Sequence, residues 1–198
     1  GLVRHHLRGA DVVAASDVEV LAVNERFLQR IQRRYPRIAA RVFAATQAPK
    51  ATVLIAAAMG VKQDYYSDFA AWLADQGYTA MTFDYRGTGA SRPEAKRHSL
   101  RGFDADLFDW ADDVDAAIEH LAVTAPGAPL YVVGHSLGAQ LPGMLKHRDR
   151  IAGLVSIAAG SGYWRDNAPP LKRMVLYFWH VLVPLATWAC GYFPGARL

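Results

Sequence analysis

The sequence predicts one α/β domain with a mostly parallel sheet between two layers of helices. Short apolar runs alternate along the chain with segments of helical periodicity. Apolar runs without polar alternation are typical of strands that are covered on both faces, as in parallel sheets. Alternating strands and helices place the ligand site at the carboxyl ends of the strands. With 198 residues and 52% apolar residues, the chain can form one such core, and disorder is excluded.

A Gly-x-Ser-x-Gly turn lies at the centre of this pattern. Gly134-His135-Ser136-Leu137-Gly138 follows the apolar run Leu130–Val133 and precedes residues that can open a helix. Between a strand and a helix, the pattern predicts a nucleophile elbow with Ser136 as nucleophile. Such a tight turn strains the serine backbone, and Gly134 and Gly138 remove side chains that would collide. The Leu137 amide then faces the site from a helix N-terminus, which favours an oxyanion. The alternative is an ordinary glycine-rich turn.

Composition narrows the classes of partner and compartment. The net charge is +4 with a pI near 9.3, but the basic residues are scattered and no aromatic-interleaved basic stripe occurs. We therefore expect no nucleic-acid partner. Cys190 is the single cysteine, which excludes an internal disulfide and a cysteine metal cage. Charged residues interrupt the N-terminal sequence, so no signal-peptide pattern is present, and we expect a cytoplasmic location.

The first part of the chain predicts an extension followed by two strands. Residues 1–37 are expected to form an N-terminal extension, and residues 38–160 the core of the domain. Within the extension, Asn24–Tyr35 has the apolar spacing of a short helix. Apolar runs predict strands at Ile38–Phe43 and Thr52–Ala57.

A helix, a third strand and a loop follow. Asp64 is placed to cap the helix, and Gly77 to end it in the left-handed conformation. The next strand is predicted at Thr79–Phe83, followed by the glycine-rich loop Asp84–Ser91. The spacing of this loop fits no known phosphate-binding pattern. We expect its Asp84 and Arg86 side chains to hold it by hydrogen bonds.

A long helix is predicted from about Phe103 to Val123. Its buried stripe consists of five apolar residues at helical spacing: Leu107, Ala111, Val114, Ile118 and Leu121. The same helix carries many Asp residues. Most of them suit a solvated face and the helix N-terminus, so no metal site is predicted.

The remaining core elements follow the serine turn. Pro142 is expected to kink the helix after Ser136 early, and Ile151–Ala158 predicts another strand. His135 is expected to point away from the site in a structural role, and His147 to face water.

Residues 161–198 differ in character from the core, and we expect them to begin a helical cap or lid. Met174–Phe193 contains no formal charge and is long enough for a transmembrane helix. His180 and Pro184 interrupt this stretch, which favours a cap over an apolar pocket. Membrane contact stays open as the alternative.

Taken together, these residues resemble the α/β-hydrolase superfamily, in particular serine hydrolases such as monoacylglycerol lipases, related esterases and serine aminopeptidases. Asp84–Ser91 is similar to the family's D-x-R-G-x-G-x-S loop, and Gly134–Ala139 matches its G-H-S-x-G-A elbow. The stretch from Ser161 to Gly195 looks like the beginning of the cap in a predicted bacterial α/β-hydrolase subgroup. The resemblance covers about residues 38–198 and implies a three-layer α/β/α sandwich.

The resemblance also implies a mechanism that needs no cofactor and no metal. Ser136 would attack a carboxylic ester and form an acyl-enzyme. The amides of Leu137 and Met59 would form the oxyanion hole, although Ala57-Ala58 replaces the family's His-Gly before that position. The apolar cap favours a small-molecule ester with an apolar acyl or aryl group.

The family's acid and histidine follow the serine in the chain, and here the pattern departs. After Ser136 the chain holds only Asp149, Asp166, His147 and His180 as Asp and His residues, and no Glu. We therefore expect a C-terminally truncated fold that lacks its acid and base. Two alternatives are a reduced hydrolase in which Asp166 orients His180 as the base, and a non-catalytic binding or scaffolding protein. His180 is also compatible with a merely structural place on the cap. A truncated sheet exposes an edge strand, so self-association is expected.

Overall fold

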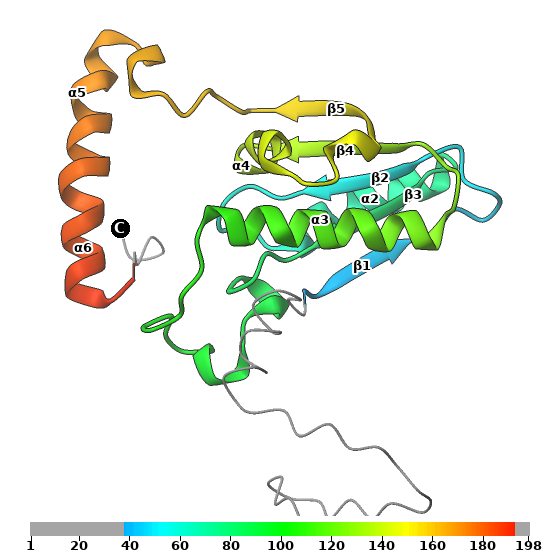
Figure 1. The fold of residues 1–198 in the computed structure, drawn as a ribbon, viewed down its shortest axis with the longest axis horizontal. Helices are drawn as coiled ribbons and strands as arrows, with labels where there is room; N and C mark the ends of the chain where they lie inside the picture. The colour runs from blue at the N-terminus through cyan, green and yellow to red at the C-terminus, as the bar shows by residue number, and fades with distance from the viewer. Residues whose placement is uncertain (1–37, 193–198) are drawn as a thin grey trace, which may run out of the picture.

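A five-stranded mixed sheet forms the centre of the computed structural model, which describes residues 38–192 (Figure 1). The strand order is β1-β3-β2-β4-β5, and only β1 runs antiparallel to its neighbour. The strands are β1 (Ala40–Phe43), β2 (Thr52–Ala56), β3 (Thr79–Phe83), β4 (Leu130–His135) and β5 (Ile151–Ile157). The prediction of a mostly parallel sheet is confirmed. The predicted extension at 1–37, with its helix at Asn24–Tyr35, lies outside the described residues.

Helices cover both faces of this sheet. In Figure 1, α3 (Leu107–Thr124) lies in front of the strands and α2 (Ser67–Asp75) lies behind them, which makes three layers. The other helical elements, including short 3₁₀ turns, are η1 (Gln63–Tyr66), η2 (Gly89–Ser91), η3 (Glu94–Lys96), α4 (Leu137–Gln140), η4 (Leu141–Met144), η5 (Arg148–Arg150), η6 (Trp164–Asp166), α5 (Pro169–Tyr177), η7 (Phe178–Leu182) and α6 (Val183–Cys190).

The core lies around the two central strands. Every residue of β2 and β3 is buried, and the face of α3 that carries Val114, Ile118 and Leu121 packs over them. Burial of each such aliphatic side chain contributes roughly 1.5–3 kcal/mol to folding. Leu107 was expected in the buried stripe but is 41% exposed, because the helix begins at this residue.

A capping box sets the beginning of α3. The Asp106 carboxylate accepts hydrogen bonds from the N–H groups of Phe108 (2.8 Å) and Asp109 (3.0 Å), and the Asp109 carboxylate accepts from the Asp106 N–H (3.0 Å). The helix therefore starts at Leu107 rather than at Phe103. Asp64 is not a helix cap as predicted: it lies within the first turn of η1 and forms an ion pair with Arg41.

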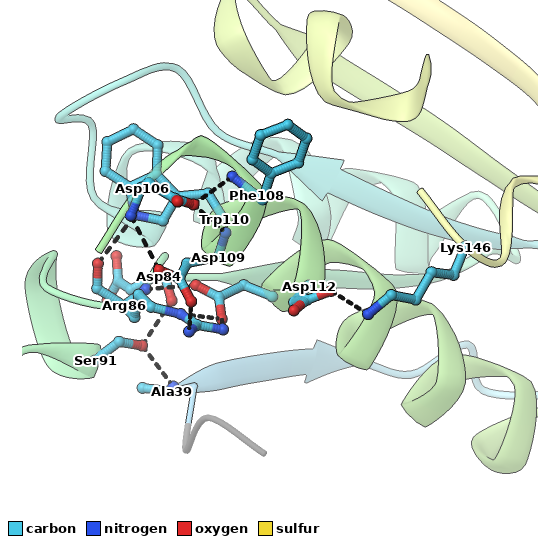
Figure 2. Close-up of polar contacts among 11 residues, drawn as sticks. Ala39, Asp84, Arg86, Ser91, Asp106, Phe108, Asp109, Trp110, Asp112 and Lys146 are labelled. Carbon is cyan, nitrogen blue, oxygen red and sulfur yellow. Dashed lines mark hydrogen bonds and ion pairs between the residues drawn. The ribbon is translucent and has the colours of Figure 1, made fainter. Parts of the chain in front are cut away.

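The glycine-rich loop is held to the sheet by a buried carboxylate. Asp84 accepts hydrogen bonds from the backbone N–H of Gln63 (2.9 Å), from the Gln63 side chain (3.0 Å) and from the Ala90 N–H (2.8 Å). The Ser91 hydroxyl donates to the Asp84 carbonyl (2.6 Å) and accepts from the Ala39 N–H (2.7 Å), as Figure 2 shows. The predicted role of hydrogen bonds in this loop is confirmed.

Arg86 ties the same loop to α3 through a buried ion pair. Its guanidinium donates to the Asp113 carboxylate from Nε (2.9 Å) and from a terminal nitrogen (2.7 Å), and it also pairs with Asp109 (2.5 Å). The Asp113 side chain is fully buried. Burial raises the pKa of the Asp113 carboxyl, while the hydrogen bonds from Arg86 act in the opposite direction. The expectation of a solvated acidic face is thus wrong for Asp113, because this carboxylate faces a cation inside the fold.

A second buried carboxylate of α3, Asp115, holds the segment that follows η4 against the helix. It is buried and accepts hydrogen bonds from the N–H groups of Lys146 (2.9 Å) and His147 (3.0 Å). The His147 ring lies 3.2 Å from this carboxylate and 3.3 Å from Glu119. His147 was expected to face water, but it lies half-buried between two carboxylates of α3.

We predict that Asp113→Ala lowers the free energy of unfolding by up to about 3–5 kcal/mol, because the Arg86 cation loses its fully buried partner and keeps only the partly exposed Asp109. Urea denaturation followed by circular dichroism measures the change. Asp112→Ala is the matched control on the same helix, since Asp112 pairs with Lys146 at the surface. The control should cost less than about 1 kcal/mol. Equal losses in the two variants would contradict the structural role of the buried pair.

Candidate functional site

The turn between β4 and α4 places Ser136 in a strained backbone conformation. Ser136 has φ 52° and ψ −112°, in the region that non-glycine residues rarely adopt. A Cβ at Gly134 would lie 2.5 Å from the Ala139 backbone, and a Cβ at Gly138 would lie 2.5 Å from the carbonyl carbon of Ala56. Only glycine fits at either position, so the turn can press directly against the end of β2.

The Ser136 backbone is also tied to the neighbouring strand. Its N–H donates to the Ile157 carbonyl at the end of β5 (2.9 Å). The next residue, Ala158, has φ 48° and is the second non-glycine residue with positive φ in residues 38–192. No sequence signal marks Ala158, because alanine is compatible with ordinary strand ends. Two strained residues therefore meet at the carboxyl edge of the sheet.

Two backbone amides lie at the same edge. Ala56 of β2 is in register with Gly134 of β4, so the turns that follow these strands are neighbours. Leu137, three residues beyond Gly134, is the first residue of α4, and its N–H belongs to the helix N-terminus. Met59, three residues beyond Ala56, has an exposed side chain and no hydrogen bond from its N–H to the described part of the chain. Both residues therefore lie at the same edge of the sheet as Ser136.

The hydroxyl of Tyr66 bridges these two turns. It accepts a hydrogen bond from the Ala58 N–H (3.0 Å) and lies 2.9 Å from Nδ1 of His135. Burial raises the pKa of Tyr66 above the ordinary value of a phenol. The protonated hydroxyl can donate to Nδ1 in the His135 tautomer that carries its proton on Nε2. The His135 ring thus serves a structural contact beside Ser136. No sequence motif marks Tyr66, so the sequence predicts only an aromatic residue on a helix and not this contact.

Asp166 and His180 are not assembled with Ser136. Asp166 ends η6, and its carboxylate accepts a hydrogen bond from the Ser161 hydroxyl. His180 lies in η7 and lines a cavity of about 200 Å³ together with Tyr163 and other residues of the same segment. Within residues 38–192, no hydrogen bond joins Asp166, His180 and the Ser136 hydroxyl to one another.

The segment that follows β5 contacts the helix after the serine turn. Gln140, the last residue of α4, donates from its side chain to the Gly160 carbonyl (2.7 Å). α4 is only four residues long and passes into η4, which contains Pro142, so the predicted early kink is confirmed. Over the described residues, no group of three or more His, Cys, Asp and Glu side chains is placed to hold a metal ion.

One continuous helix follows, formed by α5, η7 and α6. By length and composition it could cross a membrane: it spans the 22 residues Pro169–Cys190, with a mean hydropathy of 1.2. None of these residues is buried. Figure 1 shows the helix standing beyond the carboxyl ends of β4 and β5.

We predict that Gly138→Ala destabilises the fold by about 1–3 kcal/mol or more, because the new methyl group would overlap the backbone of Ala56. Gly143→Ala is the matched control, since nothing lies within 4 Å of a Cβ at that position. The control should change the free energy of unfolding by less than about 1 kcal/mol. Chemical denaturation of both variants compares them, and a stable Gly138→Ala variant would refute the tight contact.

We further predict that Tyr66→Phe costs about 1–3 kcal/mol of stability, because the buried Ala58 N–H loses its acceptor. The neighbouring Tyr65→Phe is the control, since Tyr65 is 74% exposed and should tolerate the change within about 0.5 kcal/mol. Thermal unfolding of the two variants under identical conditions tests this difference. If both variants melt together, the hydroxyl bridge has no energetic role.

Comparison with known proteins adds a family to this geometry. The sequence model of the family described as serine aminopeptidase, S33, matches residues 47–189. No curated protein sequence matches the chain.

Solved structures share the fold at low sequence identity. A soluble variant of monoglyceride lipase from Saccharomyces cerevisiae aligns with a TM-score of 0.59 and 21% identity, over 76% of this chain and 47% of that one. A thermostable carboxyl esterase from Bacillus coagulans aligns with a TM-score of 0.56 and 18% identity, over 70% of this chain and 46% of that one. A serine hydrolase without lid from Xanthomonas campestris aligns with a TM-score of 0.50 and 20% identity, over 64% of this chain and 58% of that one. The chain thus spans about half the length of the structures it matches.

Proposed function

Because this chain belongs to the serine aminopeptidase S33 family of α/β hydrolases, we propose that it is a serine hydrolase of the esterase or lipase type. The observation that carries the proposal is the strained turn at Ser136, with the amides of Leu137 and Met59 at the same edge of the sheet. A serine in this conformation, between a strand and a helix, is what a nucleophile elbow requires.

The proposed reaction is acyl transfer to water through an acyl-enzyme on Ser136. A histidine takes the proton of the serine hydroxyl as its oxygen attacks the ester carbonyl. The N–H groups of Leu137 and Met59 stabilise the negative charge on the carbonyl oxygen. The alcohol leaves with the proton from the histidine, and a water molecule then releases the acid. The scheme needs no cofactor.

We propose that the acid and the histidine come from polypeptide outside residues 38–192. In α/β hydrolases both groups follow the nucleophile in the chain. In this structure Asp166 bonds to Ser161, and His180 lines a separate cavity, so neither supports Ser136. A rearrangement that brings Asp166 and His180 to Ser136 is the alternative within the chain.

We propose that residues 161–198 form the beginning of a cap and that the substrate is a small ester with an apolar acyl or aryl group. The cavity of about 200 Å³ between residues 162–164 and the long helix supports the assignment of a cap, although Ser136 does not line it. Its lining is mainly aromatic and aliphatic, with Trp164, Val175 and Leu176 among the residues. Such a lining binds apolar groups better than charged ones.

A non-catalytic role in binding or scaffolding is the second candidate. It is favoured by the Ser136 hydroxyl, which has no histidine partner among the described residues. It is also compatible with β5, an edge strand whose Leu154, Val155 and Ile157 are exposed. Edges of this kind pair with other chains, so we propose self-association through β5 in either case.

We predict that a fluorophosphonate probe labels the protein when a histidine base is available to Ser136, and that Ser136→Ala abolishes the labelling, because only an activated serine reacts at a useful rate. Mass spectrometry of the labelled peptide locates the adduct. Ser99→Ala is the control, since Ser99 is an exposed serine in the loop before α3, and it should label as the unmodified chain does.

Each other result narrows the candidates. Labelling of Ser136→Ala at the unmodified rate would refute Ser136 as the nucleophile. Absence of labelling in every variant would be compatible both with a missing histidine and with the non-catalytic role, and would exclude a reduced hydrolase that has its own base. Loss of labelling in His180→Ala as well as Ser136→Ala would establish the reduced hydrolase with its own base.

A further inference from the structure

A cavity of about 450 Å³ lies at the carboxyl end of β3. Four segments line it: β1, the residues around the start of η1, the glycine-rich loop with the residues that follow it, and the segment after η3. In the described part of the chain, Ser136 is not among the lining residues. The volume lies in the range of pockets that bind small molecules, so the cavity has room for a ligand of that class.

Positive charge predominates in the lining of this cavity. With His98 counted as neutral, four of the lining side chains are cationic and two are anionic, which leaves an excess of two positive charges. A hollow lined mainly by one sign of charge concentrates ligands of the opposite sign. The cations are Arg41, Lys62, Arg92 and Arg97, and the anions are Asp64 and Asp84.

Among the described residues, neither carboxylate forms a buried ion pair with a cation of this cavity. Asp84 accepts only from neutral donors, namely the Gln63 N–H (2.9 Å), the Gln63 side-chain amide (3.0 Å) and the Ala90 N–H (2.8 Å). Asp64 pairs with Arg41 at the surface, where both side chains are more than half exposed. Such an exposed pair contributes little to stability, so Arg41 can exchange Asp64 for an anionic ligand.

Two of the four cations have no acidic partner within residues 38–192. Neither Lys62 nor Arg92 forms an ion pair there, whereas Arg97 pairs with Glu94 at the surface (2.6 Å). The Nε atom of Arg92 is buried, and no described residue accepts a hydrogen bond from it. A buried charged group without a partner is costly. An anion in the cavity supplies the negative charge that the described fold does not provide beside Arg92.

The backbone amides of the glycine-rich loop are already used within the loop. The Thr88 N–H donates to the Tyr85 carbonyl (2.9 Å), and the Ser91 N–H donates to the Thr88 carbonyl (3.0 Å). The Ala90 N–H is occupied by Asp84. Recognition of an anion therefore falls to the side chains around the cavity, which agrees with a loop spacing that fits no known phosphate-binding pattern.

The arrangement of the cations favours a phosphate group over a carboxylate. Guanidinium and ammonium groups on separate segments suit an anion with oxygens on several sides, as phosphate has, rather than a planar carboxylate. A phosphate group on a small molecule also carries a charge of about −1.5 to −2 at neutral pH. This charge matches the excess of two positive charges in the lining.

We propose that this cavity binds the phosphate group of a soluble small molecule, with Lys62 and Arg92 as the main contacts and Arg41 and Arg97 beside them. In the strand order the cavity lies on the other side of β2 from Ser136. The proposal stands on the cavity alone and does not depend on the proposed hydrolase chemistry.

Isothermal titration calorimetry of the full chain with inorganic phosphate and with glycerol 3-phosphate, at constant ionic strength, tests the proposal. We expect saturable binding at one site per chain, and binding of acetate at least roughly tenfold weaker because acetate carries a single charge. Arg92→Gln and Lys62→Gln should each weaken phosphate binding at least roughly tenfold. Lys62 is exposed, so its variant reports on binding even if Arg92→Gln disturbs the fold. Tighter binding of glycerol 3-phosphate would identify a phosphate ester as the ligand, and equal binding would identify free phosphate.

The matched control is Arg150→Gln, which removes the same charge from an exposed residue of η5 outside the cavity. It should bind phosphate as the unmodified chain does. Ser136→Ala should also bind normally, which separates this test from that of the active site. The proposal is overturned if no saturable binding occurs, if acetate binds as tightly as phosphate, or if Lys62→Gln and Arg150→Gln have equal effects.

Discussion

Direct backbone contact between the serine turn and the end of β2 is the constraint on which the candidate site depends. Gly138 leaves no room for a side chain over Ala56, and Gly134 leaves none over Ala139. This contact fixes the distance between the turn and the end of β2. Leu137 and Met59 each lie three places beyond the registered pair Gly134 and Ala56, so both lie at the same edge of the sheet.

Buried carboxylates organise the loops around this edge. Asp84 collects N–H groups from two loops, Asp113 neutralises Arg86, and Asp115 receives the amides of Lys146 and His147. Two of the three come from α3, which also supplies the apolar face over the sheet. One helix thus both packs the core and holds the loops around this edge of the sheet.

The sequence was sufficient for the strands, for the α/β class and for the glycines around Ser136, because apolar runs and backbone sterics are local properties. Thr79–Phe83 was predicted to the residue. The burial of Asp113 was not predicted, because an Asp on a helix is expected to face water unless its distant partner Arg86 is known. The positive φ of Ala158 was equally invisible, because it results from the contact between two strand ends.

The strand order has a consequence for biosynthesis. β2 and β3 are made early and are neighbours, β4 then adds to the free side of β2, and β5 adds to β4. From β4 onward, every new strand of this sheet adds to a free edge, and none must be inserted between two strands that are already paired. Domains begin to fold while their C-terminal parts are still being made. A sheet with this order can grow in step with translation, and on the side of β4 and β5 its outermost strand is the most recently synthesised, whereas β1 forms the opposite edge.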